Sequence, residues 1–357
     1  MNATHFSKSY AEARRRFNEA AAAIGALIRS YPVASDIDEA LAIDVACIGE
    51  EHAPTIVVSS AVHGVEGFFG SAIQLALLKQ LSSIRPQSNI RYVLIHSVNP
   101  FGFSQLRRFN EDNVDLNRNF HADDSFYQGA PPGYASLNAF LNPASPPQRF
   151  EPFALKALWN IWRNGLQSLK QTVAGGQYEY PRGIFFGGHG PCSSTQIIYD
   201  NCDAWIGAAE RVVHIDFHSG LGAFGSYKLL LPALASTEDF AWYAHAFGSQ
   251  CVERLDAEVG TAYQVSGLFD QWMQQHFASR EYRVVGAEFG TYNVLRVLAA
   301  IRAENRAHHY ANVNSSAYKA AKAELVECFC PSSARWRTQA IDSGLKIIRQ
   351  ATLALEP

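Results

Sequence analysis

An apolar run followed closely by a histidine and a glutamate is the feature that most restricts the fold of this chain. Residues 55–60 (Thr-Ile-Val-Val-Ser-Ser) are largely β-branched and apolar, which predicts a buried strand. Residues 68–78 are apolar on most faces and contain no proline, which predicts a buried helix. His63 and Glu66 therefore lie where a strand ends and a helix begins, the position at which open α/β sheets place their sites.

The pair of His63 and Glu66 is a weak signal for a metal site when taken alone. A histidine and a glutamate three residues apart in one turn can point at a common centre, and this combination suits zinc. The H-x-x-E pattern also occurs often by chance, and the alternative is a histidine bonded to a carbonyl beside a surface glutamate. The choice depends on whether the chain supplies a third ligand, a base and a group that holds substrate.

The composition allows a large core and argues against two classes of partner. The chain has 357 residues, of which 48% are hydrophobic and 18% charged, enough for one large α/β domain or two smaller ones. The formal net charge is −3, and basic residues do not cluster as a nucleic-acid surface requires. No apolar stretch approaches the roughly 18 residues of a membrane span. For these two reasons we expect neither nucleic acid nor a membrane as a partner.

The cysteines and the N-terminal segment predict a cytoplasmic location. Only Cys328 and Cys330 are close together among the six cysteines, and one C-x-C is a poor metal motif, so we expect free thiols in a reducing compartment. Residues 20–28 are apolar, but Glu19 and Arg29 bracket them and no small-x-small cleavage site follows. These features favour an amphipathic helix over a secretory signal.

Strands and helices alternate along most of the chain. We predict helices at 10–29, 68–78, 153–170 and 239–259, strands at 41–48, 55–60, 91–98, 211–218, 226–231 and 282–290, and a helical remainder to Pro357. Residues 130–147 are rich in Pro, Gly, Ser and Asn, which predicts a long loop within an insertion at about 121–190. The alternation favours a single α/β domain over residues 1–357, with a mixed, mostly parallel sheet flanked by helices.

Three of the predicted strands end in ionisable residues: His63 with Glu66, then His218, then Glu288. Because the carboxyl ends of parallel strands meet on one side of a sheet, these side chains can converge. His63, Glu66 and His218 would form the ligand set of a catalytic zinc ion that keeps a fourth position for water. Glu288 could then serve as general base and later as acid, although alone it would more simply form a salt bridge. We expect His214, on the same strand face as His218, to be a core residue or a partner of a ligand.

The chain resembles the zinc metallocarboxypeptidases, and within them a bacterial branch near the succinylglutamate desuccinylase and aspartoacylase enzymes. The family's motifs occur here in the family's order between about Thr55 and Gly290: H-x-x-E at 63–66, N-P-x-G at 99–102, D-x-N-R-N at 115–119, the second zinc histidine at His218 and the catalytic glutamate at Glu288. The resemblance implies a zinc carboxypeptidase-like fold and one zinc ion bound by His63, Glu66 and His218.

The resemblance also implies roles for the polar segment 107–119. Arg108 would stabilise the oxyanion of the tetrahedral intermediate, and Arg107 competes for this role. Asn117 and Arg118 would bind the terminal carboxylate of the substrate, the arginine through two parallel hydrogen bonds.

Three further residues have implied roles or open alternatives. Asp115 would orient the ring of a ligand histidine, with His63 as the expected partner. Tyr263, in a segment that resembles the one with the family's mobile substrate-capping tyrosine, would close over bound substrate or else pack in the core. Asp270 could favour a basic terminal residue of the substrate, and a helix cap explains it equally well.

We expect a zinc-dependent hydrolase that cleaves an amide bond next to a free carboxylate, as a carboxypeptidase does. The alternative is an N-acyl amino acid deacylase of the desuccinylase/aspartoacylase type. The short spacing between Arg108 and Asn117 resembles that of the deacylase branch. A second alternative, a non-catalytic module that binds a peptide or a carboxylate, would not need Glu288. The expected substrate is a small peptide or an N-acyl amino acid, and the sequence leaves its side-chain preference and the oligomeric state open.

Overall fold

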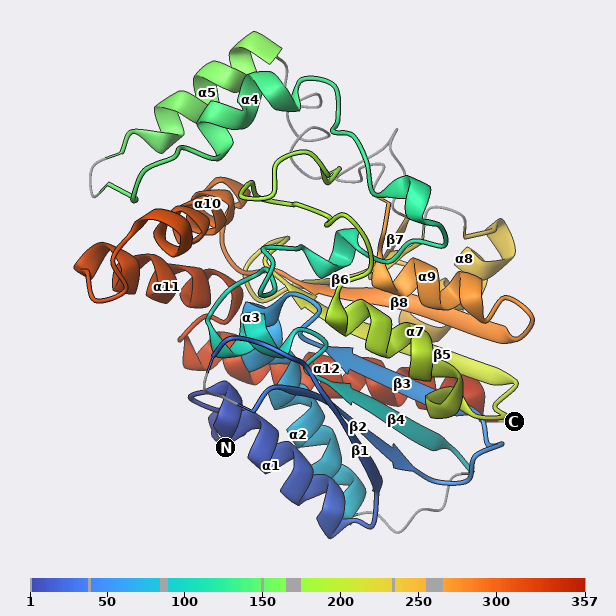
Figure 1. The fold of residues 1–357 in the computed structure, drawn as a ribbon. Coiled ribbons are helices and arrows are strands. Elements are labelled where there is room, and N and C mark those ends of the chain that lie inside the picture. The colour runs from blue at the N-terminus through green and yellow to red at the C-terminus, as the bar shows by residue number, and fades with distance from the viewer. Residues whose placement is uncertain are drawn as a thin grey trace.

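One eight-stranded mixed sheet forms the core of this protein. A computed structural model describes residues 2–37, 40–83, 89–148, 151–164, 175–232, 235–254 and 266–356. The strands are β1 (Leu27–Pro32), β2 (Ala42–Ile48), β3 (Thr55–Ser60), β4 (Arg91–His96), β5 (Arg211–Ser219), β6 (Tyr227–Leu231), β7 (Val252–Arg254) and β8 (Glu281–Phe289). Their order across the sheet is β1-β2-β4-β3-β5-β8-β6-β7 (Figure 1).

The four central strands β4, β3, β5 and β8 are parallel to one another, and β1, β2 and β6 run antiparallel to their neighbours towards the centre. Every residue of β3 and β4 is buried, as near-continuous apolar strands are when helices cover both faces of a sheet. Because β3, β5 and β8 are parallel, their carboxyl ends share one edge. The predicted mixed, mostly parallel sheet is confirmed.

Helices cover both faces of the sheet (Figure 1). One face carries α1 (Tyr10–Ala23), α2 (Gly67–Ser83), α8 (Thr237–Phe247) and α12 (Ala334–Leu355), and the other carries α7 (Ser193–Ile206) and α9 (Phe269–His276). Residues 67–78 of α2 are all buried, which explains why that segment is apolar on most faces. Ser71 and Gln74 are polar exceptions, and the Gln74 amide donates to the carbonyls of Val58 and Ile95 at 3.0 Å each.

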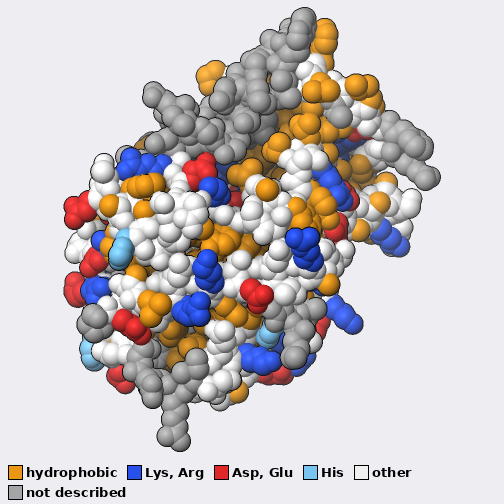
Figure 2. Space-filling model, turned by 180° about the vertical axis from the view of Figure 1, so that it is seen from behind, with side chains coloured by type: hydrophobic (Ala, Val, Ile, Leu, Met, Phe, Trp, Pro, Cys, Tyr) orange, Lys and Arg blue, Asp and Glu red, His pale blue; other side chains and the backbone are white. Residues whose placement is uncertain are grey.

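The other helices of the described ranges lie beyond the carboxyl edge of the sheet. These are α3 (Pro100–Ser104), α4 (Tyr134–Leu141), α5 (Phe153–Asn164), α10 (Val294–Tyr310) and α11 (Ser316–Phe329), with short 3-10 turns at η1 (Asn2–His5), η2 (Gly64–Glu66), η3 (Leu116–Arg118) and η4 (Asp124–Phe126). Figure 2 shows hydrophobic side chains gathered at the upper right of the opposite view, where α4 and α5 project. On α5, Leu155, Leu158 and Trp159 are more than half exposed.

Three sequence predictions about single elements were wrong. The N-terminal helix ends at Ala23 and not at Arg29, because Gly25, at a φ of +75°, reverses the chain and lets β1 pair with β2 as the edge strand. The predicted loop 130–147 contains α4. The predicted helix 239–259 ends at Phe247 and is followed by the short strand β7, while its last residues lie outside the described ranges.

Across the described residues, none of the helices is both long and apolar enough to cross a membrane. All six cysteines are free thiols, as the sequence predicts.

Candidate metal centre

The turn that carries His63 and Glu66 is fixed by a close contact between two chain segments. A Cβ on Gly64 would stand 2.1 Å from the carbonyl carbon of Gly102, so only glycine fits at position 64. The backbone N–H groups of Gly64 and Val65 donate to the carbonyls of Arg108 (3.2 Å) and Arg107 (2.7 Å). The H-x-x-E turn therefore rests directly on the N-P-x-G turn and on the arginine segment.

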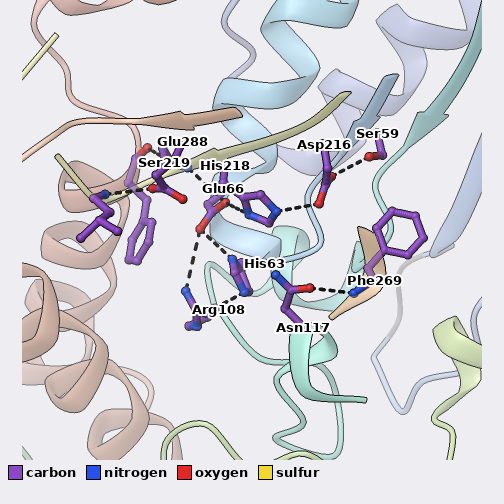
Figure 3. Close-up of polar contacts among 12 residues, drawn as sticks. Ser59, His63, Glu66, Arg108, Asn117, Asp216, His218, Ser219, Phe269 and Glu288 are labelled. Atoms are coloured by element: carbon purple, nitrogen blue, oxygen red, sulfur yellow. Dashed lines mark hydrogen bonds and ion pairs between the residues drawn. The ribbon is translucent and has the colours of Figure 1, made fainter. Parts of the chain in front are cut away.

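His63, Glu66 and His218 converge on one point at the carboxyl ends of β3 and β5 (Figure 3). The Nδ1 atom of His63 lies 2.9 Å from Oε1 of Glu66, and Nδ1 of His218 lies 3.1 Å from Oε2 of the same carboxylate. The three ligand atoms lie within 4.8 Å of one another, and all three side chains are buried. Two imidazole nitrogens and one carboxylate facing a common point fit the ligand set of a catalytic zinc ion.

Each histidine has a second carboxylate behind it. Nε2 of His63 lies 3.2 Å from Oδ1 of Asp115, and Nε2 of His218 lies 2.6 Å from Oδ2 of Asp216. Burial alone would raise the pKa of Asp115, but Arg108 and His63 outweigh this and hold it well below its usual value. Burial would likewise raise the pKa of Asp216, but the charge and hydrogen bond of His218 outweigh it and lower this pKa. Both carboxylates are thus charged and lie where they can help to fix the orientation of the rings.

The structure separates the two neighbouring arginines. Arg108 donates from Nε to Asp115 at 2.9 Å, and its Nη2 lies 2.6 Å from Nε2 of His63. Its guanidinium also lies over the ring of Phe185, 5.4 Å from the ring centre. Arg107 instead donates from Nε to Glu304 of α10 at 3.0 Å and is fully buried. Arg108 therefore lies within the cluster, and Arg107 anchors the segment from outside it.

Glu288 lies on the strand next to His218, and the two are direct neighbours in the register of β5 and β8 (Figure 3). Its Oε1 accepts a hydrogen bond from the backbone N–H of Leu221 at 2.9 Å. Burial, followed by the nearby charge of Glu66, raises the pKa of Glu288 to about 7. A carboxyl group with such a pKa can both take up and release a proton near neutrality.

Asn117 and Arg118 lie in η3, directly after Asp115. Oδ1 of Asn117 accepts from the backbone N–H of Phe269 at 3.0 Å, which ties η3 to the start of α9. Arg118 is buried, its Nη1 donates to the Asn117 carbonyl at 2.5 Å, and a Cβ on Gly176 would come 2.7 Å from its Cδ. Tyr263, the predicted capping residue, lies outside the described residues.

Sequence reasoning missed the pairing of Asp216 with His218. Their spacing of two along a strand does predict that both side chains lie on one face, but it does not predict that they are paired. It also missed that the backbone N–H of Ser219 donates to Oε2 of Glu66 at 3.3 Å, because no pattern in the sequence relates these residues.

Comparison with solved structures identifies the class of fold. Carboxypeptidase A from Helicoverpa armigera is similar over 96% of this chain and 73% of its own, with 14% identity and a TM-score of 0.50. Bovine thrombin-activatable fibrinolysis inhibitor, solved with tick carboxypeptidase inhibitor, matches 95% of this chain and 98% of its own at 12% identity and a TM-score of 0.49. Succinylglutamate desuccinylase/aspartoacylase from Rhodobacter sphaeroides matches 80% and 63% at 14% identity and a TM-score of 0.39.

The chain thus has the zinc carboxypeptidase-like fold, and the fold class predicted from the motifs is confirmed. A family model described as "Protein of unknown function (DUF2817)" matches residues 6–343, so the chain belongs to that family. A search of curated proteins finds no match.

Proposed function

We propose that this protein is a zinc-dependent hydrolase that cleaves an amide bond next to a free carboxylate. The observation that carries the proposal is the convergence of His63, Glu66 and His218 within 4.8 Å at the carboxyl edge of the sheet. One zinc ion would be held by Nδ1 of both histidines and by the Glu66 carboxylate. Zinc in such a site lowers the pKa of water and polarises a carbonyl group.

The chain's own groups supply the remaining chemistry in this proposal. Glu288 takes a proton from the attacking water on its carboxylate and passes it to the nitrogen of the leaving amine. The guanidinium of Arg108 stabilises the negative charge that develops on the carbonyl oxygen of the substrate. Asp115 accepts from Nε of Arg108 at 2.9 Å, so it keeps the arginine beside the cluster.

The substrate's carboxylate would bind at Asn117 and Arg118, and Tyr263 would close over it. Arg118 suits this role because a guanidinium can form two parallel hydrogen bonds with a carboxylate. The link from Asn117 to Phe269 supports the assignment, since it holds η3 against the helix that carries Asp270.

An N-acyl amino acid deacylase is the second candidate. Gly176 packs on the side chain of Arg118, and the Tyr178 hydroxyl donates to the Arg118 carbonyl at 2.9 Å. This close packing favours a small substrate, which fits an acylated amino acid as well as a short peptide.

The cytoplasmic location of this protein stays a prediction.

Product identification tests the proposal. The zinc-loaded protein is incubated with a pool of short peptides and N-acyl amino acids, and products are identified by mass spectrometry. Release of single C-terminal residues establishes a carboxypeptidase, whereas release from acylated amino acids alone establishes a deacylase.

Two variants make the result specific. Glu288→Gln should bind zinc and lose about 10²- to 10⁴-fold in rate. Glu281→Gln, at the exposed start of the same strand, should keep full activity. Equal activity of Glu288→Gln and wild type would contradict the proposed mechanism, and a metal-loaded wild type that only binds these compounds would indicate a binding module.

A further inference from the structure

A row of buried polar side chains leads away from His218 along the sheet (Figure 3 shows its first part). Oδ1 of Asp216 lies 2.6 Å from Oγ of Ser59 on β3, and Oγ of Ser59 lies 2.8 Å from Nε2 of His214. Nδ1 of His214 lies 3.0 Å from the hydroxyl of Tyr282 on β8. Ser59, His214, Asp216 and Tyr282 are all at most 4% exposed, so these groups depend on one another for hydrogen bonds.

The direction of each hydrogen bond in this row is determined by the chemistry of the groups. A carboxylate only accepts, so the single hydroxyl proton of Ser59 goes to Asp216. Ser59 can then only accept from His214, which requires the proton of His214 to be on Nε2. Burial lowers the pKa of His214 to about 4, so the ring is neutral at pH 7 and its Nδ1 accepts from the Tyr282 hydroxyl.

The same reasoning reaches the other end of the row. Oδ2 of Asp216 can only accept, so Nε2 of His218 donates to it at 2.6 Å. The Nδ1 atom of His218, which faces Glu66, is then the atom left to bind a metal ion. Both oxygens of Asp216 have a donor, one from the ligand histidine and one from Ser59.

We propose that Tyr282, His214 and Ser59 are positioning residues that act through Asp216 and set which nitrogen of His218 is presented to the metal. The inference rests on the proposed metal centre. At one end of the row, Tyr282 lies near the start of β8, opposite Val212 of β5. At the other end, His218 lies at the carboxyl end of β5, so the row spans most of the length of these two strands. Loss of the Tyr282 hydroxyl would let the His214 ring place its proton on Nδ1, and Ser59 would then turn its own proton from Asp216 to His214.

The first test uses the unaltered, metal-free protein. Nuclear magnetic resonance of protein with ¹⁵N-labelled histidine reports which ring nitrogen carries a proton. We expect His214 to be protonated on Nε2, and to shift towards the Nδ1-protonated form in Tyr282→Phe. Protonation of wild-type His214 on Nδ1 would overturn the proposal, whether or not any variant folds.

The second test is zinc affinity, measured by competition with a chelator. We expect about tenfold weaker binding in Ser59→Ala and about threefold weaker binding in Tyr282→Phe, at or below the lower end of the range for groups that orient metal ligands. Tyr243→Phe is the matched control, because Tyr243 is equally buried and its hydroxyl donates to the Val284 carbonyl of the same strand without touching the row.

Unchanged zinc affinity in both Ser59→Ala and Tyr282→Phe would contradict the positioning role. An equal loss of affinity in Tyr243→Phe would do the same, because it would indicate a general effect of a lost buried hydrogen bond. A wild-type protein that binds no zinc would contradict the proposed function, and the ring protonation of His214 would still decide whether the row is ordered as described.

Discussion

Asp115 and Asp216 lie behind the two histidines of the cluster. Asp216 is in direct hydrogen-bond contact with His218, whereas Asp115 lies beside Arg108, which contacts His63 more closely. Each carboxylate lies behind one ring, at Nε2, so that Nδ1 of that ring faces Glu66. The two carboxylates come from unrelated parts of the chain, one from the segment before η3 and one from the middle of β5. The geometry of the site therefore depends on groups that would not themselves touch the metal.

Replacing Asp115 with alanine should weaken zinc binding. The substitution removes the carboxylate behind His63 and leaves the buried charge of Arg108 without its partner at 2.9 Å. We expect zinc affinity to fall about 10- to 100-fold, measured by competition with a chelator. Asp112→Asn, an exposed residue of the same loop, should bind zinc as wild type does. Unchanged affinity in Asp115→Ala would show that this carboxylate does not orient His63.

Replacing Gly64 with alanine should destabilise the protein and disturb the cluster. The new methyl group would stand 2.1 Å from the Gly102 carbonyl carbon, and this backbone contact cannot be relieved by a side-chain rotation. We expect a loss of about 3 kcal/mol in the free energy of unfolding, measured by urea denaturation. Gly190→Ala is the control, since a Cβ there meets nothing within 4 Å. Equal stability of the two variants would contradict the close contact.

The stability of the protein should decrease in acid through Glu151. This carboxylate accepts from Arg302 at 2.7 and 2.9 Å and also pairs with Arg306, which ties the segment before α5 to α10. The hydrogen bonds from Arg302, strengthened by both charges, lower the pKa of Glu151 from 4.5 to about 2. Because the folded-state pKa is the lower one, the stabilisation is fully present above about pH 4.5 and is lost as the pH falls towards 2.

Glu151→Gln separates this contribution from other acid effects. We expect the variant to be about 2 kcal/mol less stable than wild type at pH 7 and to approach wild type as the pH falls from 4.5 towards 2, measured by urea denaturation at each pH. Glu179→Gln, an exposed glutamate, should match wild type throughout. If the difference in stability between Glu151→Gln and wild type did not change with pH, it would arise from the shape of the side chain and not from its charge.

Asp270 should determine the side-chain preference of the proposed hydrolase. It is buried at the start of α9, its Oδ1 accepts from the backbone N–H of Gln271 at 2.7 Å, and burial together with the charge of Asp216 raises its pKa to about 6. We expect peptides that end in lysine or arginine to be preferred, since a bound cation would pair with this carboxylate. Asp270→Asn should reduce that preference about 10- to 100-fold in the ratio of kcat/KM values.

The comparison uses matched peptides that end in lysine or in norleucine, which have side chains of similar length. Trp272→Phe serves as the control for disturbance of α9, because it keeps a ring against Tyr199 and leaves the carboxylate in place. If Asp270→Asn kept the wild-type ratio of kcat/KM values, Asp270 would have no role in substrate preference and would only form its hydrogen bond in the first turn of α9.

Local patterns allowed much of the fold to be predicted. The strands near 42–48, 55–60, 91–96, 211–219 and 281–289 follow from runs of apolar residues, because burial on both faces requires such runs wherever the strand lies in the sheet. The predicted helices 10–29 and 239–259 were too long, because each prediction runs into an edge strand. An edge strand forms by pairing with a neighbouring strand, which a local pattern does not show. The alanine-rich segment before Gly25 contains no sign of that pairing.

The sequence by itself determined the ionisable residues at the strand ends, since His63, Glu66, His218 and Glu288 each follow an apolar run. Only the tertiary structure decided which of two adjacent arginines lies beside them. Arg107 and Arg108 donate to Glu304 and Asp115, and these partners come from different parts of the chain. The order of the hydrogen bonds behind His218 was likewise decided in three dimensions, because contacts between strands distant in sequence depend on sheet register, which no local pattern encodes.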